Sequence, residues 1–168
     1  MEMQTTKKQK SKQDWGTPPD FKSAVERRFG PLAWDLACHD DGRNSLTDTT
    51  GMFGPTVDSL KQDWHKIEGG YLWLNPPYAD IAPWARKCKY ESSKGAKILM
   101  LTPASVDSNW FRESCLHQCL TLALNPRIKF VGANAGYNKP LMLTVWGHDV
   151  ITADGLPLVD LFNQWRWR

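Results

Sequence analysis

Short apolar runs alternate with amphipathic segments along most of this chain. A continuous run of aliphatic and aromatic residues, bounded by Gly, Pro, Asn or Asp, is typical of a buried strand. Such runs predict strands at Leu32–Cys38, Tyr71–Leu74, Lys97–Pro103, Cys119–Leu124, Ile128–Val131 and Leu141–Trp146.

Three segments between these runs carry apolar residues at helical spacing, and each begins near a residue that suits a helix start. The predicted helices run from Pro19 to about Phe29, from about Asp80 to Ser93, and from Asp107 to His117. Residues 39–55 are loop-like, and Val57–His65 is predicted as a short helix or turn.

Strands that alternate with helices predict an α/β fold, with a mainly parallel sheet covered by helices on both faces. Ile128–Val131 and Leu141–Trp146 are joined without a helix, so we expect them to form an antiparallel pair. The end of the chain, Leu161–Arg168, carries two tryptophans. It is predicted to be a packed terminal segment, because exposed tryptophans favour association.

The chain of 168 residues is long enough for one good core, so we predict a single domain over residues 13–168. No apolar stretch approaches membrane-spanning length, and the start lacks the apolar centre of a secretory signal. We therefore expect a cytoplasmic protein with reduced cysteines. Cys115, His117 and Cys119 resemble metal ligands but lack a second pair, so we expect no metal.

Positive charge is concentrated at the N-terminus. Residues 1–12 hold four lysines against Glu2, whereas the remainder holds 17 basic and 17 acidic residues. We predict that this segment is a disordered tail. It is either a solubility tail or a basic arm, with Lys7 and Lys8, that adds contacts to nucleic-acid phosphates.

The motif Asn75-Pro76-Pro77-Tyr78 directly follows the buried strand Tyr71–Leu74. Two prolines fix an extended backbone and offer no N–H, so the carbonyls of Asn75 and Pro76 can face a ligand. An amide oxygen, a free carbonyl and an aromatic face together suit the binding of a planar amino group. The alternative is a rigid turn that ends a strand.

The motif and its surroundings resemble the bacteriophage DNA N6-adenine methyltransferases, over about residues 14–147. The resemblance implies a Rossmann-like class I methyltransferase fold, S-adenosylmethionine as methyl donor, and double-stranded DNA as partner. The chain departs from that pattern in lacking a Gly-rich loop after the first strand and in having Ser105 after Pro103-Ala104. The matching pieces are Trp15–Pro18, Trp34–Cys38, Asn44, Asp58–Trp64, Leu72–Tyr78 with Ile81 and Trp84, Leu101–Ala104, Trp110-Phe111 and Arg127–Phe130.

The resemblance also implies roles for individual residues. The motif Asn75–Tyr78 is the expected catalytic element, and Tyr78 is expected to stack on a base flipped out of the duplex. We expect the methyl donor to contact Trp15, Thr17, Pro18, Asp35, Ala37 and Asp58. The expected DNA contacts, besides Lys7 and Lys8, are Ser105, Asn109, Trp110, Lys129, Asn138 and Lys139.

Several alternatives stay open at the level of sequence. Methylation of cytosine N4 uses the same chemistry, and an RNA or a protein glutamine amide also presents a planar amino group. A DNA-binding relative without turnover is a further possibility. The resemblance suggests GATC as recognition site, and we expect a monomer or a weak dimer.

Overall fold

The computed structural model describes residues 16–39, 45, 51–147 and 162–168. The N-terminal tail, with Lys7 and Lys8, and Trp15 lie outside the described residues. None of the described helices is long and apolar enough to cross a membrane.

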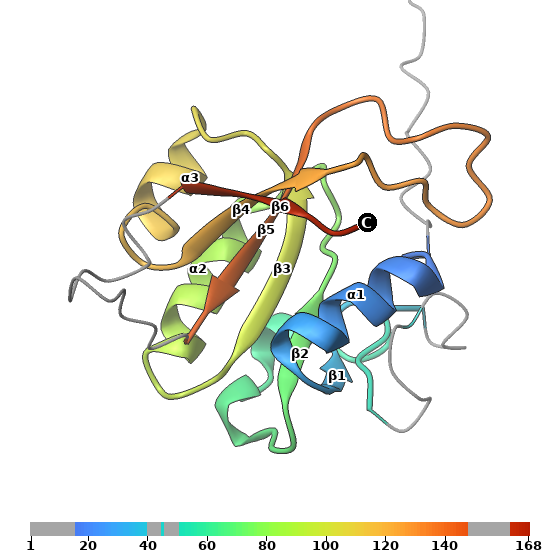
Figure 1. Cartoon of the computed structure of the whole chain (residues 1–168). Coiled ribbons are helices and arrows are strands. Elements are labelled where there is room, and N and C mark those ends of the chain that lie inside the picture. The colour runs from blue at the N-terminus through green and yellow to red at the C-terminus, as the bar shows by residue number, and fades with distance from the viewer. Residues whose placement is uncertain (1–15, 40–44, 46–50, 148–161) are drawn as a thin grey trace, which may run out of the picture.

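Within this part of the chain, one mixed sheet of six strands forms the centre of the molecule, in the order β1-β2-β3-β5-β4-β6 (Figure 1). β1 pairs with β2, β2 with β3, and β4 with β6 in parallel, whereas β5 is antiparallel to both β3 and β4. Five strands therefore point the same way and β5 is reversed. The strands are β1 (Leu32–Asp35), β2 (Tyr71–Leu74), β3 (Ile98–Pro103), β4 (Leu120–Asn125), β5 (Leu141–Trp146) and β6 (Phe162–Arg166).

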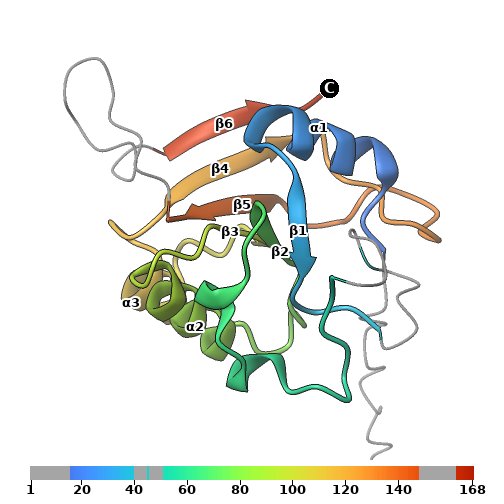
Figure 2. The same ribbon diagram turned by 90° about the horizontal axis from the view of Figure 1, so that it is seen from below.

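Helices lie on both faces of the sheet, as Figure 2 shows. Helix α1 (Pro19–Phe29) covers one face; α2 (Ala82–Ser92) and α3 (Asn109–Ser114) lie on the other. Two short 3-10 turns, η1 (Ser59–Lys61) and η2 (Trp64–Lys66), precede β2. The expected α/β architecture with a doubly covered sheet is thus observed.

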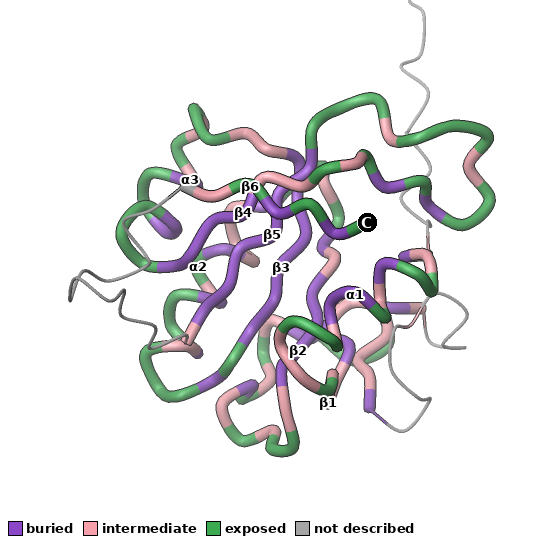
Figure 3. Tube along the Cα trace, viewed as in Figure 1, coloured by how far each residue is buried: buried purple, intermediate pink, exposed green. Residues whose placement is uncertain are grey.

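Successive side chains along a strand point alternately into two apolar cores, one on each face of the sheet. Along β3, Leu99 and Leu101 pack on the α1 side, while Ile98 and Met100 pack on the α2 side. Both cores are fully enclosed, and exposed residues gather in the connections (Figure 3). This two-sided burial explains why β2 and β3 read as continuous apolar runs in the sequence.

The predicted strand Ile128–Val131 is wrong. Ile128 and Phe130 are buried, but no strand forms there, because this backbone bonds to segments outside the sheet: Val131 N donates to the Gly16 carbonyl and Tyr137 N donates to the Ile128 carbonyl. The antiparallel direction of Leu141–Trp146 was predicted correctly, but its partners are β3 and β4.

Three further elements differ from their predicted bounds. β1 ends at Asp35, after which Cys38 N bonds the Phe53 carbonyl, so the chain leaves the sheet to pair with a loop segment. Helix α3 ends at Ser114, and His117 adopts a left-handed backbone with φ 58°, which stops the predicted continuation. Val57–His65 contains η1 and the start of η2 rather than one helix.

The C-terminal segment is packed, as predicted, and it also forms β6 alongside β4. Trp165 and Trp167 are buried against Phe21 of α1, with ring centroids 5.9 and 5.0 Å away. Arg168 pairs with Asp20 at the start of α1. The end of the chain therefore closes the core on the α1 face.

Candidate active site

The Asn75–Tyr78 motif leaves the carboxyl end of β2, at the edge of the sheet where the parallel strands β1 and β3 also end. Ligands of open α/β sheets bind at this edge. The Oδ1 atom of Asn75 is buried and has no hydrogen-bond partner among the described residues. An acceptor buried without a partner costs free energy, so this atom is poised to accept from a ligand.

A cavity of about 490 Å³ opens on one side of the motif. This volume is in the range of small-ligand sites. Its walls come from the chain after β1, the loop before η1, the motif and α2. The lining residues are Leu36–His39, Phe53–Pro55, Val57–Ser59, Asn75, Pro77 and Trp84.

Two of the residues expected to contact a methyl donor, Ala37 and Asp58, line this first cavity. Asp58 also pairs with Lys61 on the surface, with its Oδ2 3.1 Å from the Lys61 Nζ. Asp35 does not line the cavity: it is 2% exposed, and its Oδ1 accepts a hydrogen bond from Ala37 N at 3.1 Å. Asp35 therefore shapes the cavity wall through Ala37.

The structure does not place Thr17 or Pro18 in the first cavity. Thr17 is buried at the entrance to α1, and the Pro18 carbonyl accepts from the first turn of that helix. Both residues lie at the N-terminal boundary of the described chain, next to Trp15. Their contact with a methyl donor stays a prediction.

A second cavity, of about 1000 Å³, opens on the other side of the motif. Two loops that are far apart in sequence meet here, the one before α3 and the one before β5. Of the residues expected to touch DNA, Ser105, Trp110, Asn138 and Lys139 line it. The full lining is Tyr78–Ala82, Pro103, Ser105, Ser108, Trp110 and Gly132–Lys139.

Tyr78 forms part of the wall of this second cavity. Its ring packs edge-on against Tyr137, with centroids 5.9 Å apart, and Tyr137 packs on Phe130 at 5.7 Å. The Tyr78 hydroxyl is buried without a partner in the described part of the chain. Burial, and to a lesser extent the neighbouring Tyr137, raises the pKa of Tyr78 well above its usual value, so the ring is neutral.

Two expected DNA contacts lie elsewhere. Asn109 begins α3 beside the cavity lining without joining it, and Lys129 is exposed on the segment before the Gly132–Lys139 loop. That loop is braced by Arg127, whose guanidinium donates to the Asn138 carbonyl at 3.4 Å. Of the basic residues Arg127, Lys129 and Lys139, Lys139 is the one that lines the second cavity.

The sequence profile of the DNA N-6-adenine-methyltransferase (Dam) family matches residues 4–146. The chain belongs to this family. The resemblance read from the Asn75–Tyr78 motif and its neighbours is thereby confirmed.

Two curated relatives share the description DNA N-6-adenine-methyltransferase. The protein of Haemophilus phage HP1 (strain HP1c1) is 27% identical over 147 residues, which cover 83% of this chain and 81% of the relative. The protein of Escherichia phage T1 is 28% identical over 100 residues, covering 60% of this chain but only 40% of the relative. No solved structure matches.

Within this Dam-family chain, sequence reasoning did not assign a role to Ser59, Trp84 or Tyr137. Ser59 and Trp84 line the first cavity, and Tyr137 lines the second. A signal existed for Tyr137, since a lone aromatic in a Gly/Asn-rich loop has little to pack against locally. For the other two, only the fold shows which side of the turn or helix faces the cavity.

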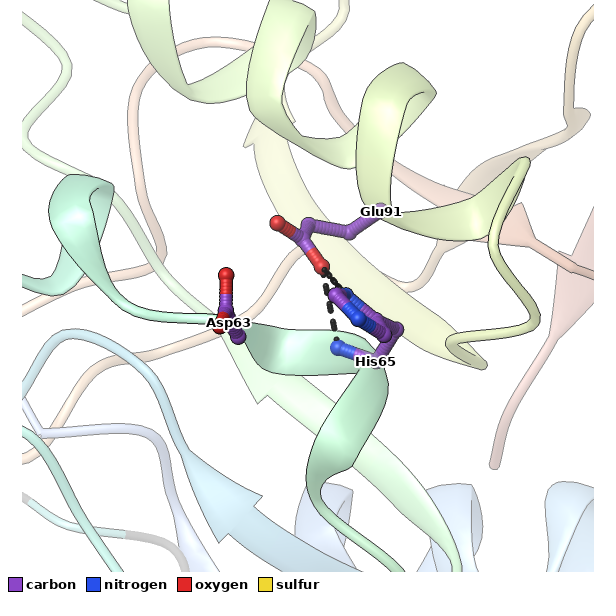
Figure 4. Close-up of side chains that lie close together, drawn as sticks. All are labelled: Asp63, His65 and Glu91. Atoms are coloured by element: carbon purple, nitrogen blue, oxygen red, sulfur yellow. Dashed lines mark hydrogen bonds and ion pairs between the residues drawn. The ribbon is translucent and has the colours of Figure 1, made fainter.

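Asp63, His65 and Glu91 form the group of described residues whose donor atoms come closest to a metal-binding arrangement, within 4.8 Å of one another. Figure 4 shows that His65 and Glu91 bond directly, with Asp63 to one side. Each carboxylate already has a lysine partner. The Lys66 Nζ lies 2.7 Å from Asp63 Oδ2, and the Lys87 Nζ lies 2.6 Å from Glu91 Oε1. We interpret the group as an ionic tie between η2 and α2.

Glu91 is the fully buried centre of this tie. Its Oε2 accepts from His65 N at 2.9 Å and lies 2.6 Å from His65 Nδ1. Burial alone would raise the pKa of Glu91, but the hydrogen bonds from Lys87 and His65 outweigh it and lower the pKa. The carboxylate is therefore charged and stabilising in the folded protein.

Glu91→Gln is expected to lower the free energy of unfolding by about 2–4 kcal/mol at pH 7, because Lys87 is left without its buried partner. The wild-type advantage is fully present above the ordinary glutamate pKa of about 4.3, and it is lost as the pH falls through the lower pKa of the folded state. Urea denaturation at several pH values measures both effects. Glu113→Gln, on the surface, is the matched control and should change stability by less than about 0.5 kcal/mol. Equal effects of the two variants would contradict a buried ionic tie.

Proposed function

We propose that this chain transfers the methyl group of S-adenosylmethionine to the exocyclic N6 of adenine in duplex DNA. The observation that carries the proposal is the Asn75 Oδ1 atom, buried without a partner in the described chain, on a motif whose residues line both cavities. A transfer enzyme needs two adjoining sites, one for the donor and one for the acceptor. The proposed place of action is the bacterial cytoplasm.

The first cavity suits the methyl donor. Its walls combine aromatic and apolar side chains with the Asp58 carboxylate, which matches a positively charged nucleoside. We expect the buried carboxyl group of Asp35, which accepts a hydrogen bond from Ala37 N, to add to the negative potential of this wall. When bound, S-adenosylmethionine supplies a methyl group activated by its sulfonium. We also propose a class I, Rossmann-like methyltransferase fold, because five of the described strands share one direction and β5 is reversed.

The second cavity suits a flipped adenine. Tyr78, the last residue of the motif, offers a neutral aromatic ring in its wall. Stacking on such a ring contributes about 1–3 kcal/mol per base. Polar residues of the two loops, among them Ser105, Asn138 and Lys139, also line this cavity, where they would meet neighbouring bases of a duplex. We propose that they read the recognition site, for which the family resemblance suggests GATC.

The chain's own groups then orient the reacting nitrogen. The lone pair of the adenine amine is delocalised into the ring, so the amine is a poor nucleophile. Asn75 Oδ1 and the Pro76 carbonyl accept its two hydrogens, which favours tetrahedral geometry and directs the lone pair towards the first cavity. Orientation of this kind supplies several kcal/mol of barrier reduction. Asn75 is not a base at neutral pH, so the proton leaves to water after transfer.

The direct test is incorporation of labelled methyl groups into DNA, followed by nucleoside analysis. N6-methyladenine is the expected product. N4-methylcytosine, or label found in RNA or protein but not in DNA, would contradict the proposed substrate. Methylation sequencing of DNA from cells that express the protein then gives the recognition site.

Tyr78→Ala is expected to weaken capture of the flipped base by about 10- to 100-fold, since the stacking face is lost. Tyr78→Trp should retain much of the activity, because any flat aromatic that fits can stack. Tyr78→Phe should retain nearly all of it, because the hydroxyl it removes has no partner among the described residues. Fluorescence of 2-aminopurine at the target position reports base flipping. A Tyr78→Ala variant that flips and methylates as the wild type does would exclude the stacking role.

A further inference from the structure

Ser59 lines the first cavity and carries a second buried polar atom without a partner among the described residues. The residue is 6% exposed, and its Oγ has no hydrogen-bond partner within the described part of the chain. It lines the same cavity as Asn75, whose Oδ1 is also without a partner. Two such atoms in one cavity indicate a ligand that satisfies both.

The backbone of Ser59 is held firmly in place. Its carbonyl accepts from Gln62 N at 3.0 Å, which closes η1, and from the indole Nε1 of Trp64 at 2.9 Å. Trp64 is fully buried and stacks on Trp84 of α2, with centroids 6.3 Å apart and planes at 21°. The Ser59 hydroxyl is therefore presented from a rigid position, as a pre-organised ligand group requires.

The ionic tie between η2 and α2 (Figure 4) also restrains Trp64. Lys87 lies over the Trp64 ring at 5.6 Å while it pairs with Glu91, and Glu91 bonds His65, the residue after Trp64. Trp64 is thus held by Trp84, by Lys87 and, through the neighbouring His65, by Glu91. The Ser59 carbonyl thus has two donors, whereas its hydroxyl has no partner among the described residues.

The neighbours of Ser59 in the cavity indicate which part of a ligand it meets. Phe53 and Trp84 offer aromatic surface, Val57 offers an apolar wall, and Asp58 offers a carboxylate. Aromatic and apolar walls with a few polar groups suit a heteroaromatic base joined to a sugar. A free amino acid, with two charges and no ring, suits them poorly.

We infer that the Ser59 hydroxyl hydrogen-bonds the nucleoside half of the methyl donor and is a binding residue of this site. The inference rests on the proposed function, because it takes the first cavity as the donor site. It adds a residue and an orientation to that function: the nucleoside lies towards η1, and the methyl-bearing end lies towards Asn75.

Calorimetric affinities for three ligands test the inference: S-adenosylmethionine, S-adenosylhomocysteine and methylthioadenosine, which lacks the amino-acid half. Ser59→Ala is expected to weaken all three by a similar factor of about ten. Ser59→Cys keeps the size but bonds weakly, so a smaller loss is expected. Ser93→Ala, on the exposed end of α2, is the matched control and should bind as the wild type does.

The thermal stability of the ligand-free protein gives a second readout. Because the hydroxyl has no partner in the described chain, Ser59→Ala should leave the melting temperature of the free protein unchanged or raise it. A lower melting temperature would mean that Ser59 is a structural residue and would overturn the inference.

The outcomes also distinguish a failure of this inference from a failure of the proposed function on which it rests. Wild-type protein that binds none of the three ligands would overturn the proposed function itself. Wild-type binding with an unchanged Ser59→Ala variant would overturn only the role of Ser59. A loss confined to the two ligands that carry the amino-acid half would reverse the proposed orientation.

Discussion

Asn75→Ala is expected to reduce the rate of methyl transfer by about 100- to 1000-fold, while the methyl donor and DNA still bind. The variant loses the acceptor Oδ1, which matters most as the reacting nitrogen becomes tetrahedral. Interactions made mainly in the transition state affect turnover rather than binding. The magnitude follows from the loss of one pre-organised hydrogen-bonding group at a reacting centre. Single-turnover methylation of a DNA duplex, with donor affinity measured in parallel, gives the two quantities separately.

Asn75→Asp is the matched control for this prediction. It keeps an acceptor oxygen at the position of Oδ1 and replaces the amide nitrogen by a second oxygen, and an acidic residue is one of those that the motif accommodates in amino-methyltransferases. Its rate should stay within about tenfold of the wild type. Near wild-type methylation by Asn75→Ala would overturn the proposed mechanism, since that mechanism depends on the Asn75 Oδ1 acceptor.

Elements defined by local signals were predicted closely. β2 and β5 have the predicted bounds, because each is an apolar run with Gly, Pro or Asn directly before and after it. Helix α1 begins at a proline and ends before Gly30, whose φ of 99° suits glycine. In these cases the residues next to the element decide where it ends.

Elements defined by distant partners were not predicted. Ile128–Val131 has the burial of a strand but lies against Gly16 instead of a neighbouring strand. β6 forms because its backbone pairs with β4, about forty residues earlier in sequence. The residues of β6 themselves do not indicate that partner. Sequence pattern reports that a segment is buried, but the surroundings decide what it pairs with.

The candidate site divides in the same way. The Asn75–Tyr78 motif is contiguous, so its chemistry could be read from the sequence. Ser59 and Tyr137 reach the two cavities only because η1 packs on α2 and the Gly132–Lys139 loop meets the motif. Asp35 shows the converse: its type and its place at the end of a strand suggested direct donor contact, which stays a prediction, and in the structure its buried side chain bonds Ala37 N of the cavity wall.

Asp35→Ala is expected to weaken binding of S-adenosylmethionine by at least about 100-fold while the protein stays folded. The carboxylate holds Ala37 N, and with it the wall formed by Leu36–His39. We also expect it to place a negative charge next to that wall, where the surrounding protein screens a charge less than water would. Removal of the side chain loses both contributions. Calorimetry measures the affinity, and circular dichroism checks the fold.

Asp35→Asn separates the two contributions. The amide keeps an acceptor for Ala37 N but removes the charge, so the loss that remains in this variant measures electrostatic attraction to the cationic donor. Hydrogen bonds to charged groups contribute about 1.5–3 kcal/mol, so we expect Asp35→Asn to bind roughly 10- to 100-fold more weakly than the wild type. Affinity for S-adenosylhomocysteine, which lacks the sulfonium charge, should fall less. If Asp35→Ala binds the donor within a few-fold of the wild type, the donor site lies away from β1 and the assignment of the first cavity fails.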